Sequence, residues 1–292
     1  MCRLAGVSRA GFYRHWEERA PDEAAMALRD AVQRAALVHR SYGCRRIAAV
    51  LEREGWTVSP SRVLGITRSD NLLAVRKRRF IVTTDSGHDL LIYPNLAANL
   101  VCSGINQLWV ADITYIRLAA EFVYLAVVLD AFSRRVVGWT LGRTLQATLP
   151  LQALNRAIAA RQPGPGLMHH SDRGSQYASA AYVARLEECK MIVSMSRPGK
   201  PWENARCESF IKTLKQEEID ARGYRNLEEL ERHLEEFIED IYNRRRLHSA
   251  LGYRTPEEFE TQPSLPQQPL TTRPAGLSFP RHEEIYPDAR PH

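Results

Sequence analysis

The sequence has few cysteines and no long apolar run. Its five cysteines form no C-x-x-C pair, so the sequence predicts neither disulfides nor a structural zinc knuckle, as is typical of a reducing compartment. No apolar stretch approaches the roughly eighteen residues that a membrane-spanning helix needs, and no charged-then-apolar leader is present. We therefore expect a cytoplasmic protein that has no membrane partner.

The excess of positive charge is confined to the first third of the chain. The 292 residues carry 40 Lys and Arg against 34 Asp and Glu, a formal net charge of +6. The first 105 residues hold sixteen basic against ten acidic side chains, whereas residues 106–262 hold twenty-one of each. This asymmetry is expected when one part of a chain binds an acidic polymer such as DNA and another part carries acids for chemistry.

Three helical segments are predicted in the basic part, at residues 22–39, 43–54 and 61–71. Ser59 and Pro60 supply an N-cap and a first-turn proline for the third helix. The last two helices are compatible with a helix-turn-helix, or with a small helical bundle whose arginines only face water. The basic run that follows favours DNA binding by a helical region spanning residues 1–79. The candidate DNA-contacting side chains are Arg62, Arg68, Arg76, Lys77, Arg78 and Arg79.

Beyond a predicted linker at residues 80–105, the hydrophobic period changes to that of strands. Three β-rich runs separated by short turns indicate an antiparallel meander, and alternating helices and strands follow it. This order predicts a mixed α/β sheet within a domain at residues 106–262. Residues 263–292 contain seven prolines and are predicted to be a flexible tail. The predicted strands are 109–117, 122–130, 135–141, 167–170 and 191–194, and the helices between them are 146–160 and 179–188.

Two further helices are predicted near the end of this domain, one beginning at about residue 202 and one at residues 227–243. One face of the first helix presents a carboxylate among cations and amides, while Phe210 and Leu214 lie on the opposite face. A carboxylate flanked by lysines suits a metal ion held next to a phosphate backbone. The residues on that face are Asn204, Glu208, Lys212 and Lys215.

Two aspartates are candidate partners for Glu208. Asp112 lies among apolar residues in a predicted strand, and Asp172 comes just after another strand. Each acid alone has an ordinary interpretation, as a local cap, a turn residue or an ion-pair partner of Lys212. Converging from two neighbouring strands and a helix, however, three ionised acids would repel one another unless divalent cations lay between them. A pair of Mg²⁺ ions could activate a water or a 3′-hydroxyl and stabilise a leaving oxygen.

Two histidines precede Asp172 and have two interpretations. His169 and His170 could be metal ligands, or they could serve hydrogen bonding and packing. We favour the second interpretation because the three acids already suffice for metal binding.

The motifs together resemble the catalytic core of the retroviral-integrase-like Asp-Asp-Glu transposases, and in particular the second-frame (orfB-type) product of two-frame bacterial insertion sequences. The resemblance extends from Trp109 to Glu260, and an upstream segment is similar to the family's helix-turn-helix. Leu247 departs from the family pattern, in which we expect proline. The segments that carry the resemblance are 42–47, 109–115, 170–177, 203–215, 242–243 and 248–253.

The resemblance implies an RNase H-like fold and catalysis that depends on Mg²⁺, with Mn²⁺ as a substitute and two ions per site. It implies that water frees a 3′-hydroxyl at the element end, and that this hydroxyl then attacks another phosphodiester with no covalent protein intermediate. Asp112, Asp172 and Glu208 would be the catalytic metal ligands. By the same resemblance, Lys215 and Lys212 approach the terminal DNA, and Asn204 and Gln176 shape that site.

The resemblance also implies the partners: the terminal inverted repeats of an insertion sequence, target DNA, and a homo-oligomer assembled on DNA. Fusion to, or pairing with, a first-frame product is expected as well, in a bacterial, nucleoid-associated setting. Two alternatives are an RNase H-like nuclease that cuts without joining and a non-catalytic DNA-binding regulator. The regulator predicts a missing acid, whereas all three acids are present.

Overall fold

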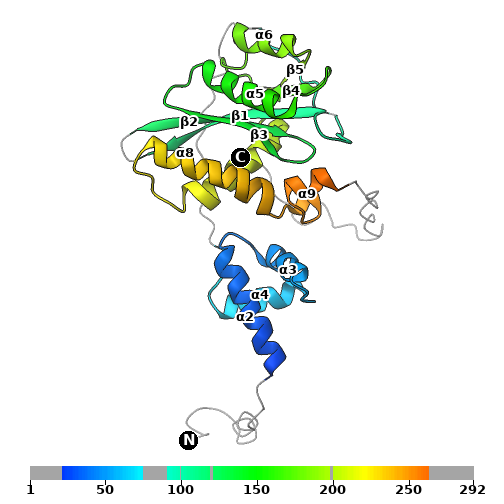
Figure 1. Ribbon diagram of the computed structural model, residues 1–292, viewed down its shortest axis with the longest axis vertical. Coiled ribbons are helices and arrows are strands. Elements are labelled where there is room, and N and C mark those ends of the chain that lie inside the picture. Colours follow the sequence, from blue (N-terminus) through cyan, green and yellow to red (C-terminus); the bar gives the residue numbers. More distant parts are fainter. Residues whose placement is uncertain (1–21, 75–90, 99, 119–120, 198–199, 263–292) are drawn as a thin grey trace, which may run out of the picture.

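The structure is a computed structural model that describes residues 22–74, 91–98, 100–118, 121–197 and 200–262. The basic run at residues 76–79, most of the predicted linker's first half and the proline-rich tail lie outside the described residues. In Figure 1 a small helical part lies beside a larger body built on a sheet. None of the described helices is both long enough and apolar enough to cross a membrane.

The helical part consists of three helices, and the sequence predicts each to within two residues. Asp22 caps the first helix by accepting a hydrogen bond from the Ala25 amide at 3.0 Å, and Ser59 caps the third. Asp70, at the end of the third helix, accepts hydrogen bonds from Arg29 and Gln33 on the first. Leu28, Val32, Ile47, Leu51 and Val63 form the core. The helices are α2 (Glu23–Val38), α3 (Cys44–Arg53) and α4 (Pro60–Ser69).

The body contains a five-stranded sheet in the order β3-β2-β1-β4-β5. The first three strands form the predicted antiparallel meander, while β4 and β5 continue the sheet by parallel pairing beside β1. The mixed α/β sheet of an RNase H-like core is therefore confirmed. The strands are β1 (Leu108–Arg117), β2 (Phe122–Asp130), β3 (Val136–Gly142), β4 (Met168–Ser171) and β5 (Ile192–Met195).

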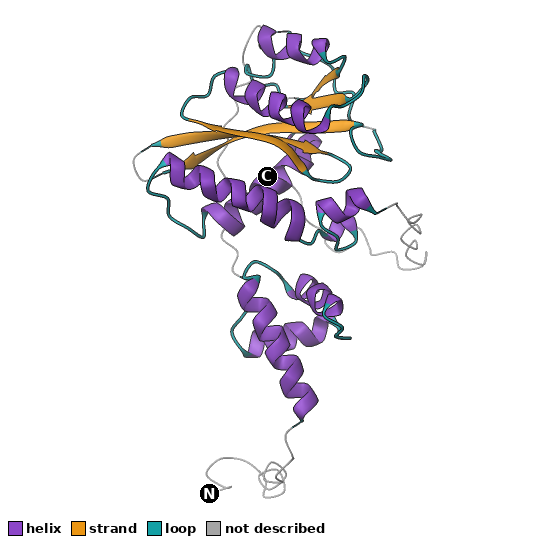
Figure 2. Cartoon of the chain, in the orientation of Figure 1, coloured by secondary structure: helices purple, strands orange, loops and turns teal. Residues whose placement is uncertain are grey.

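Helices cover both faces of the sheet (Figure 2). On one face, α5 (Thr148–Arg161) and α6 (Ala180–Glu188) bury Leu154 and Tyr182 among others. On the other face, α7 (Ala205–Leu214) and α8 (Leu227–Glu235) pack on the strands. Because successive strand residues alternate between faces, Leu108, Val110 and then Asp112 point toward the α7 side.

The last two predicted helices are not wholly α-helical, which corrects the sequence prediction. A 3₁₀ turn, η1 (Pro201–Asn204), precedes α7, and a π-helical segment, η2 (Lys215–Ile219), follows it. The predicted helix at 227–243 continues α8 as a second π-helical segment, η3 (Glu236–Arg245). This wider coil buries Tyr242 and Asn243 next to each other. The Asn243 amide exchanges hydrogen bonds with the backbone N–H and C=O of Val136 at 3.0 and 3.1 Å.

Direct contacts join the helical part to the body. The buried Tyr42 hydroxyl accepts a hydrogen bond of 3.0 Å from the amide of Leu247. Arg53 donates to the carboxylate of Glu258 at 2.8 and 2.9 Å and to the Tyr253 carbonyl at 2.9 Å. Leu247, the position that departs from the family's expected proline, is thus buried with its N–H in use, a hydrogen bond that proline could not donate.

Candidate active site

The register of the sheet brings two of the predicted acids together. In the parallel pairing of β1 with β4, Val110 lies opposite His170. Asp112 comes two residues after Val110 and still lies within β1. Asp172 comes two residues after His170, immediately after the end of β4. Polar groups at the carboxyl end of a strand in an open α/β sheet face the crevice where ligands bind. The two aspartates therefore flank one point at the edge of this crevice.

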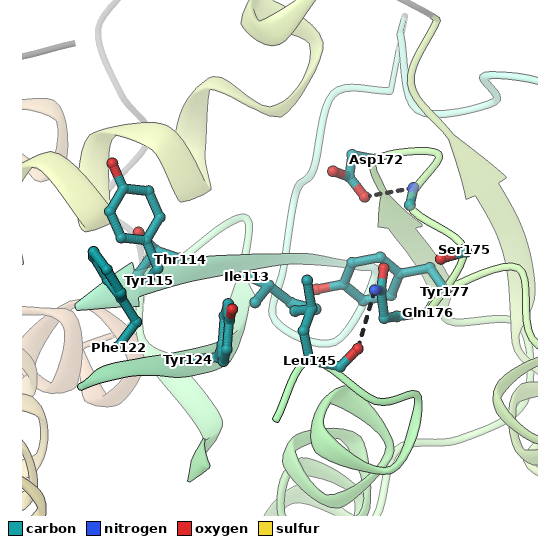
Figure 3. A pocket seen from close by; sticks show the side chains of 11 residues that line it. Ile113, Thr114, Tyr115, Phe122, Tyr124, Leu145, Asp172, Ser175, Gln176 and Tyr177 are labelled. Carbon is teal, nitrogen blue, oxygen red and sulfur yellow. Dashed lines mark hydrogen bonds between the residues drawn. The ribbon is translucent and has the colours of Figure 1, made fainter. Parts of the chain in front are cut away.

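A tight turn after β4 orients Asp172. The Asp172 Oδ1 atom accepts a hydrogen bond of 2.9 Å from the amide of Gly174 (Figure 3). A side chain at position 174 would conflict with this turn, because an added Cβ would lie 3.1 Å from Asp172 Oδ1 and 3.0 Å from Gln176 Oε1. Glycine at this position thus allows the backbone to approach the carboxylate closely.

The third acid, Glu208, lies in the first turn of α7 and is exposed. Cys207 and Phe210 fix this helix against the sheet and are fully buried. Asn204, just before the helix, donates a hydrogen bond of 2.9 Å to the carbonyl of Ala111, the neighbour of Asp112. Asn204 is only 7% exposed, whereas Glu208 is exposed, so the two side chains do not share one exposed helix face as the helical period predicts. Asn204 positions the start of α7 on the strand that carries Asp112.

The carboxyl of Asp112 lies in an environment that disfavours its charge. Burial and the negative charge of Asp172, with a smaller contribution from Glu208, raise the Asp112 pKa to about 7. A hydrogen bond of 2.8 Å from the Ile113 amide and the charge of Lys215 oppose this rise only partly. The neighbouring acids therefore concentrate negative charge, which favours the protonated form of Asp112.

The donor chemistry of these three acids fits a hard divalent cation, since all their donor atoms are carboxylate oxygens. Within the described ranges, no group of three His, Cys, Asp or Glu side chains is already arranged to hold a metal ion. Asp112 and Asp172 are fixed by the sheet, whereas the exposed Glu208 side chain on α7 has room to turn toward them. Because its pKa is raised, the Asp112 carboxyl holds its proton more tightly than an ordinary aspartate, and a cation that binds there would displace this proton.

A groove beside Asp172 has a volume of about 340 Å³. Aromatic rings of β1 and β2 line one end, and the turn that follows β4 lines the other (Figure 3). Gln176, predicted to shape the site, lies in this lining and donates a hydrogen bond of 3.2 Å to the Leu145 carbonyl. The lining side chains include Ile113, Tyr115, Phe122, Tyr124, Leu145, Ser175, Gln176 and Tyr177. Sequence reasoning did not select these aromatic residues, because alternating aromatic residues in a strand usually belong to a core.

The two predicted lysines on the Glu208 side differ in their surroundings. Lys215 is half-buried, and its Nζ atom lies 4.7 Å from the centre of the Tyr115 ring. Burial lowers the Lys215 pKa, while Asp220 and Asp112 oppose the change. Lys212 is exposed one turn after Glu208. Lys215 therefore links α7 to the groove, whereas Lys212 faces solvent.

The remaining predicted residues lie away from the acids. Arg62 and Arg68 are exposed on α4. His169 and His170 are buried, with His169 Nε2 at 3.0 Å from the Tyr182 hydroxyl and His170 Nδ1 at 2.9 Å from Ser194 Oγ. Burial lowers their pKa values to about 3 and about 4. The hydrogen-bonding interpretation of both histidines is confirmed.

Comparison with protein families accounts for most of the described chain. Residues 103–201 match the family described as Integrase core domain, and residues 190–256 match a second family with the same description. Residues 23–80 match a family described as HTH-like domain. The last match covers α2, α3 and α4, the helices for which the sequence predicts a helix-turn-helix.

Curated relatives span nearly the same length. The chain is 35% identical over 264 residues to an uncharacterized 31 kDa protein of insertion element IS600 from Shigella sonnei, covering 89% of this chain and 97% of the relative. It is 35% identical over 268 residues to the transposase InsF for insertion sequence IS3A from Escherichia coli K12, covering 90% and 93%. A transposase for insertion sequence element IS904 from Lactococcus lactis is 36% identical over 220 residues, covering 75% and 87%.

Solved structures with a similar arrangement are more distant. One is the intasome of simian T-cell lymphotropic virus in complex with a PP2A regulatory subunit, with a TM-score of 0.46, 17% identity, and coverage of 85% of this chain and 80% of that one. Another is the catalytic core domain of HTLV-2 integrase in complex with magnesium, with a TM-score of 0.42, 17% identity, and coverage of 54% and 98%.

Proposed function

The chain belongs to the insertion-sequence transposases that have an integrase core domain, and we propose that it cuts the ends of its element and joins them to target DNA by direct transesterification. The observation that supports this proposal is that Asp112 and Asp172 each come two residues after the facing pair Val110 and His170, and that the charges of Asp172 and Glu208 both act on Asp112. Glu208 lies on α7, and Asn204 at the start of that helix is hydrogen-bonded to Ala111. An HTH-like domain match supports DNA as the substrate.

In this proposal Asp112, Asp172 and Glu208 hold divalent cations, Mg²⁺ or Mn²⁺. A bound pair of such ions would make a water or a 3′-hydroxyl a better nucleophile and would neutralise charge on the leaving oxygen. The protein's own contribution is to hold the carboxylates in place. Asp172 is oriented by the Gly174 amide and Asp112 by the Ile113 amide, so both acids are fixed before substrate binds.

The groove and its surroundings supply the contacts to DNA in this proposal. Lys215, held over Tyr115, carries a positive charge to the edge of the groove, where a phosphate of the terminal strand would lie. The aromatic rings at this same end of the groove offer stacking surfaces for an unpaired base. Arg62 and Arg68 on α4, with the basic run at 76–79, would contact the duplex, and Lys212 would add a solvent-exposed phosphate contact.

The test is a joining assay with labelled DNA ends of the element in Mg²⁺ or Mn²⁺. The unmodified chain is compared with Glu208→Gln and with the matched control Glu231→Gln, an exposed glutamate on α8. Joined product that is lost only in Glu208→Gln supports the proposal. Cleavage without joining would favour the nuclease alternative, and DNA binding without chemistry in any of the three proteins would contradict the proposal.

A further inference from the structure

A second, strongly basic cavity lies where the helical part meets the body. It is a partly open cavity of about 70 Å³, and its lining is almost entirely polar. Its residues come from three distant parts of the chain: α3, the turn between β2 and β3, and the segment from α7 to η4 (Ser249–Leu251). The side chains that matter here are Arg46, Arg134, Ser209, Thr213, Arg246 and His248.

Only one of the three arginines in this cavity has its charge matched. Arg246 is buried and forms a two-pronged ion pair with Glu217, with distances of 2.7 and 2.9 Å. Neither Arg46 nor Arg134 forms an ion pair with a carboxylate among the residues that the structure describes. Burial lowers the pKa of both guanidinium groups, and the charge of Arg246 lowers that of Arg46 further. The cavity thus holds positive charge that no described residue neutralises.

A buried polar atom in the same lining has no partner. His248 is 6% exposed, and its Nε2 atom makes no hydrogen bond. Its ring packs edge-on against Tyr242, with the ring centres 4.8 Å apart. Buried polar atoms are nearly always hydrogen-bonded, so an orphan of this kind indicates a bound water, ion or ligand atom in the cavity. This observation is independent of the arginine charges and points to the same cavity.

We propose that this cavity binds one backbone phosphate of the DNA on which the protein acts. The proposal rests on the proposed function in requiring a DNA substrate. The guanidinium groups of Arg46 and Arg134 and the hydroxyls of Ser209 and Thr213 offer hydrogen-bond donors from several directions, which suits the oxygens of a phosphate. A DNA phosphate is the occupant because the cavity joins the HTH-like helices, through Arg46, to the catalytic body.

Because α7 contributes to the cavity, a phosphate bound there would align the DNA strand with the Glu208 carboxylate on the same helix. Ser209 directly follows Glu208, so the two side chains diverge by about 100° around the helix. One face of α7 thus presents the candidate catalytic carboxylate, and the adjacent face lines the phosphate cavity. A strand held in the cavity would be fixed relative to Glu208 through a single helical turn.

The first experiment measures binding of a mixed-sequence DNA duplex to the full chain at several KCl concentrations, without divalent cations. Each phosphate contact contributes about 0.9 to the slope of log affinity against log salt concentration. Because both arginines contact the same phosphate, Arg46→Gln and Arg134→Gln are each expected to reduce that slope, and the double variant by about 0.9 in total, whereas the control Arg185→Gln on α6 leaves it unchanged. Unchanged slopes in both cavity variants would overturn the proposal.

A second experiment with inorganic phosphate distinguishes a DNA phosphate from a free phosphate ion as the occupant of the cavity. Phosphate should raise the unfolding temperature of the unmodified chain above that in KCl of equal ionic strength, and it should do so less for Arg134→Gln. Phosphate should also compete with the duplex. Stabilisation by phosphate combined with an unchanged salt slope in the arginine variants would make this a site for a free anion, and would overturn the assignment to DNA.

A third variant, which places a negative charge in the cavity, tests the proposal even if the arginine variants fail to fold. Ser209→Asp places a carboxylate beside the unmatched arginines, so the unfolding temperature should rise while duplex affinity falls at least several-fold. The control Gln152→Asp, exposed on α5, adds the same charge on the other face of the sheet. Unchanged duplex affinity in Ser209→Asp would overturn the proposal. All these readouts are independent of DNA joining, so failure of the joining assay leaves them interpretable.

Discussion

Asp112 and Asp172 each follow by two residues the facing pair Val110 and His170 of the parallel β1–β4 register. The sheet therefore holds two carboxyl groups together before any cation is bound. Burial of Asp112, together with this neighbouring carboxylate, raises the pKa of Asp112 to about 7. A group of this kind makes the protein's stability depend on pH in a direction opposite to that of an ion-paired acid.

Asp112→Asn should stabilise the metal-free protein at pH 8. The unfolded-state pKa of an aspartate is about 3.9, so the folded state binds an extra proton between about pH 4 and pH 7 and the free energy of unfolding falls as pH rises through that window. Asparagine removes this penalty. Allowing for partial solvent screening, the expected gain at pH 8 is about 1–2 kcal/mol.

Thermal unfolding in EDTA at pH 5 and pH 8 measures this effect. The difference between Asp112→Asn and the unmodified chain should be small at pH 5 and larger at pH 8. The control Asp220→Asn, at an exposed position, should show no such pH dependence. A destabilised Asp112→Asn protein at pH 8 would contradict the assigned environment.

Gly174→Ala should impair chemistry while leaving the fold intact. The added methyl group would lie 3.1 Å from Asp172 Oδ1 and 3.0 Å from Gln176 Oε1, which forces the carboxylate or the amide to move. The neighbouring atoms must move by a few tenths of an ångström, less than the displacement of about 1 Å that can lower a rate by about 100-fold. The joining rate should therefore fall measurably but by less than about 100-fold, with circular dichroism unchanged. Gly164→Ala is the control, because a Cβ there meets nothing within 4 Å.

Asn204→Ala should loosen the start of α7. The variant removes the hydrogen bond from Asn204 to the Ala111 carbonyl and leaves a buried acceptor unpaired, at a cost of about 1–3 kcal/mol in the free energy of unfolding. Denaturant unfolding measures this loss, with the exposed Gln216→Ala as the control. Duplex affinity should stay within about two-fold, because a buried side chain makes no phosphate contact. A large loss of duplex affinity with normal stability would contradict this prediction and would indicate that Asn204 contacts DNA.

Tyr42→Phe should weaken the joint between the helical part and the body. It removes the acceptor for the buried Leu247 amide, at a cost of about 1–3 kcal/mol. Hydrogen exchange is the direct measurement, since the Leu247 amide should exchange faster while amides in the centre of β2 keep their protection. Tyr93→Phe serves as a control outside this joint. Unchanged exchange at Leu247 would show that the contact contributes nothing.

Much of the fold follows from local pattern. The caps at Asp22 and Ser59, with Pro60 after the second, determine where α2 and α4 begin, and these signals are written in adjacent residues. The strands of the meander follow from β-rich runs between short turns. The acids Asp112 and Asp172 could be selected because a carboxylate among apolar strand residues, or at a strand end, needs a particular reason.

Features that depend on distant contacts could not be predicted in this way. The helical period assigned Asn204 to the same exposed face as Glu208, but the 3₁₀ turn η1 changes the angle before α7 begins and turns its side chain toward Ala111. The π-helical segments have no local signal, since they depend on side chains such as Asn243 meeting the sheet. Arg46 and Arg134 are 88 residues apart and converge only when the helical part meets the body.

The hydrogen bonds between Asn243 and Val136 have a consequence for self-association. β3 is an edge strand of the five-stranded sheet, and edge strands present unpaired backbone groups that can recruit another chain. At Val136 both the N–H and the C=O are already bound by a side-chain amide. The Asn243 side chain thus occupies the backbone groups that a neighbouring strand would bind, and it prevents intermolecular β-pairing at this end of β3.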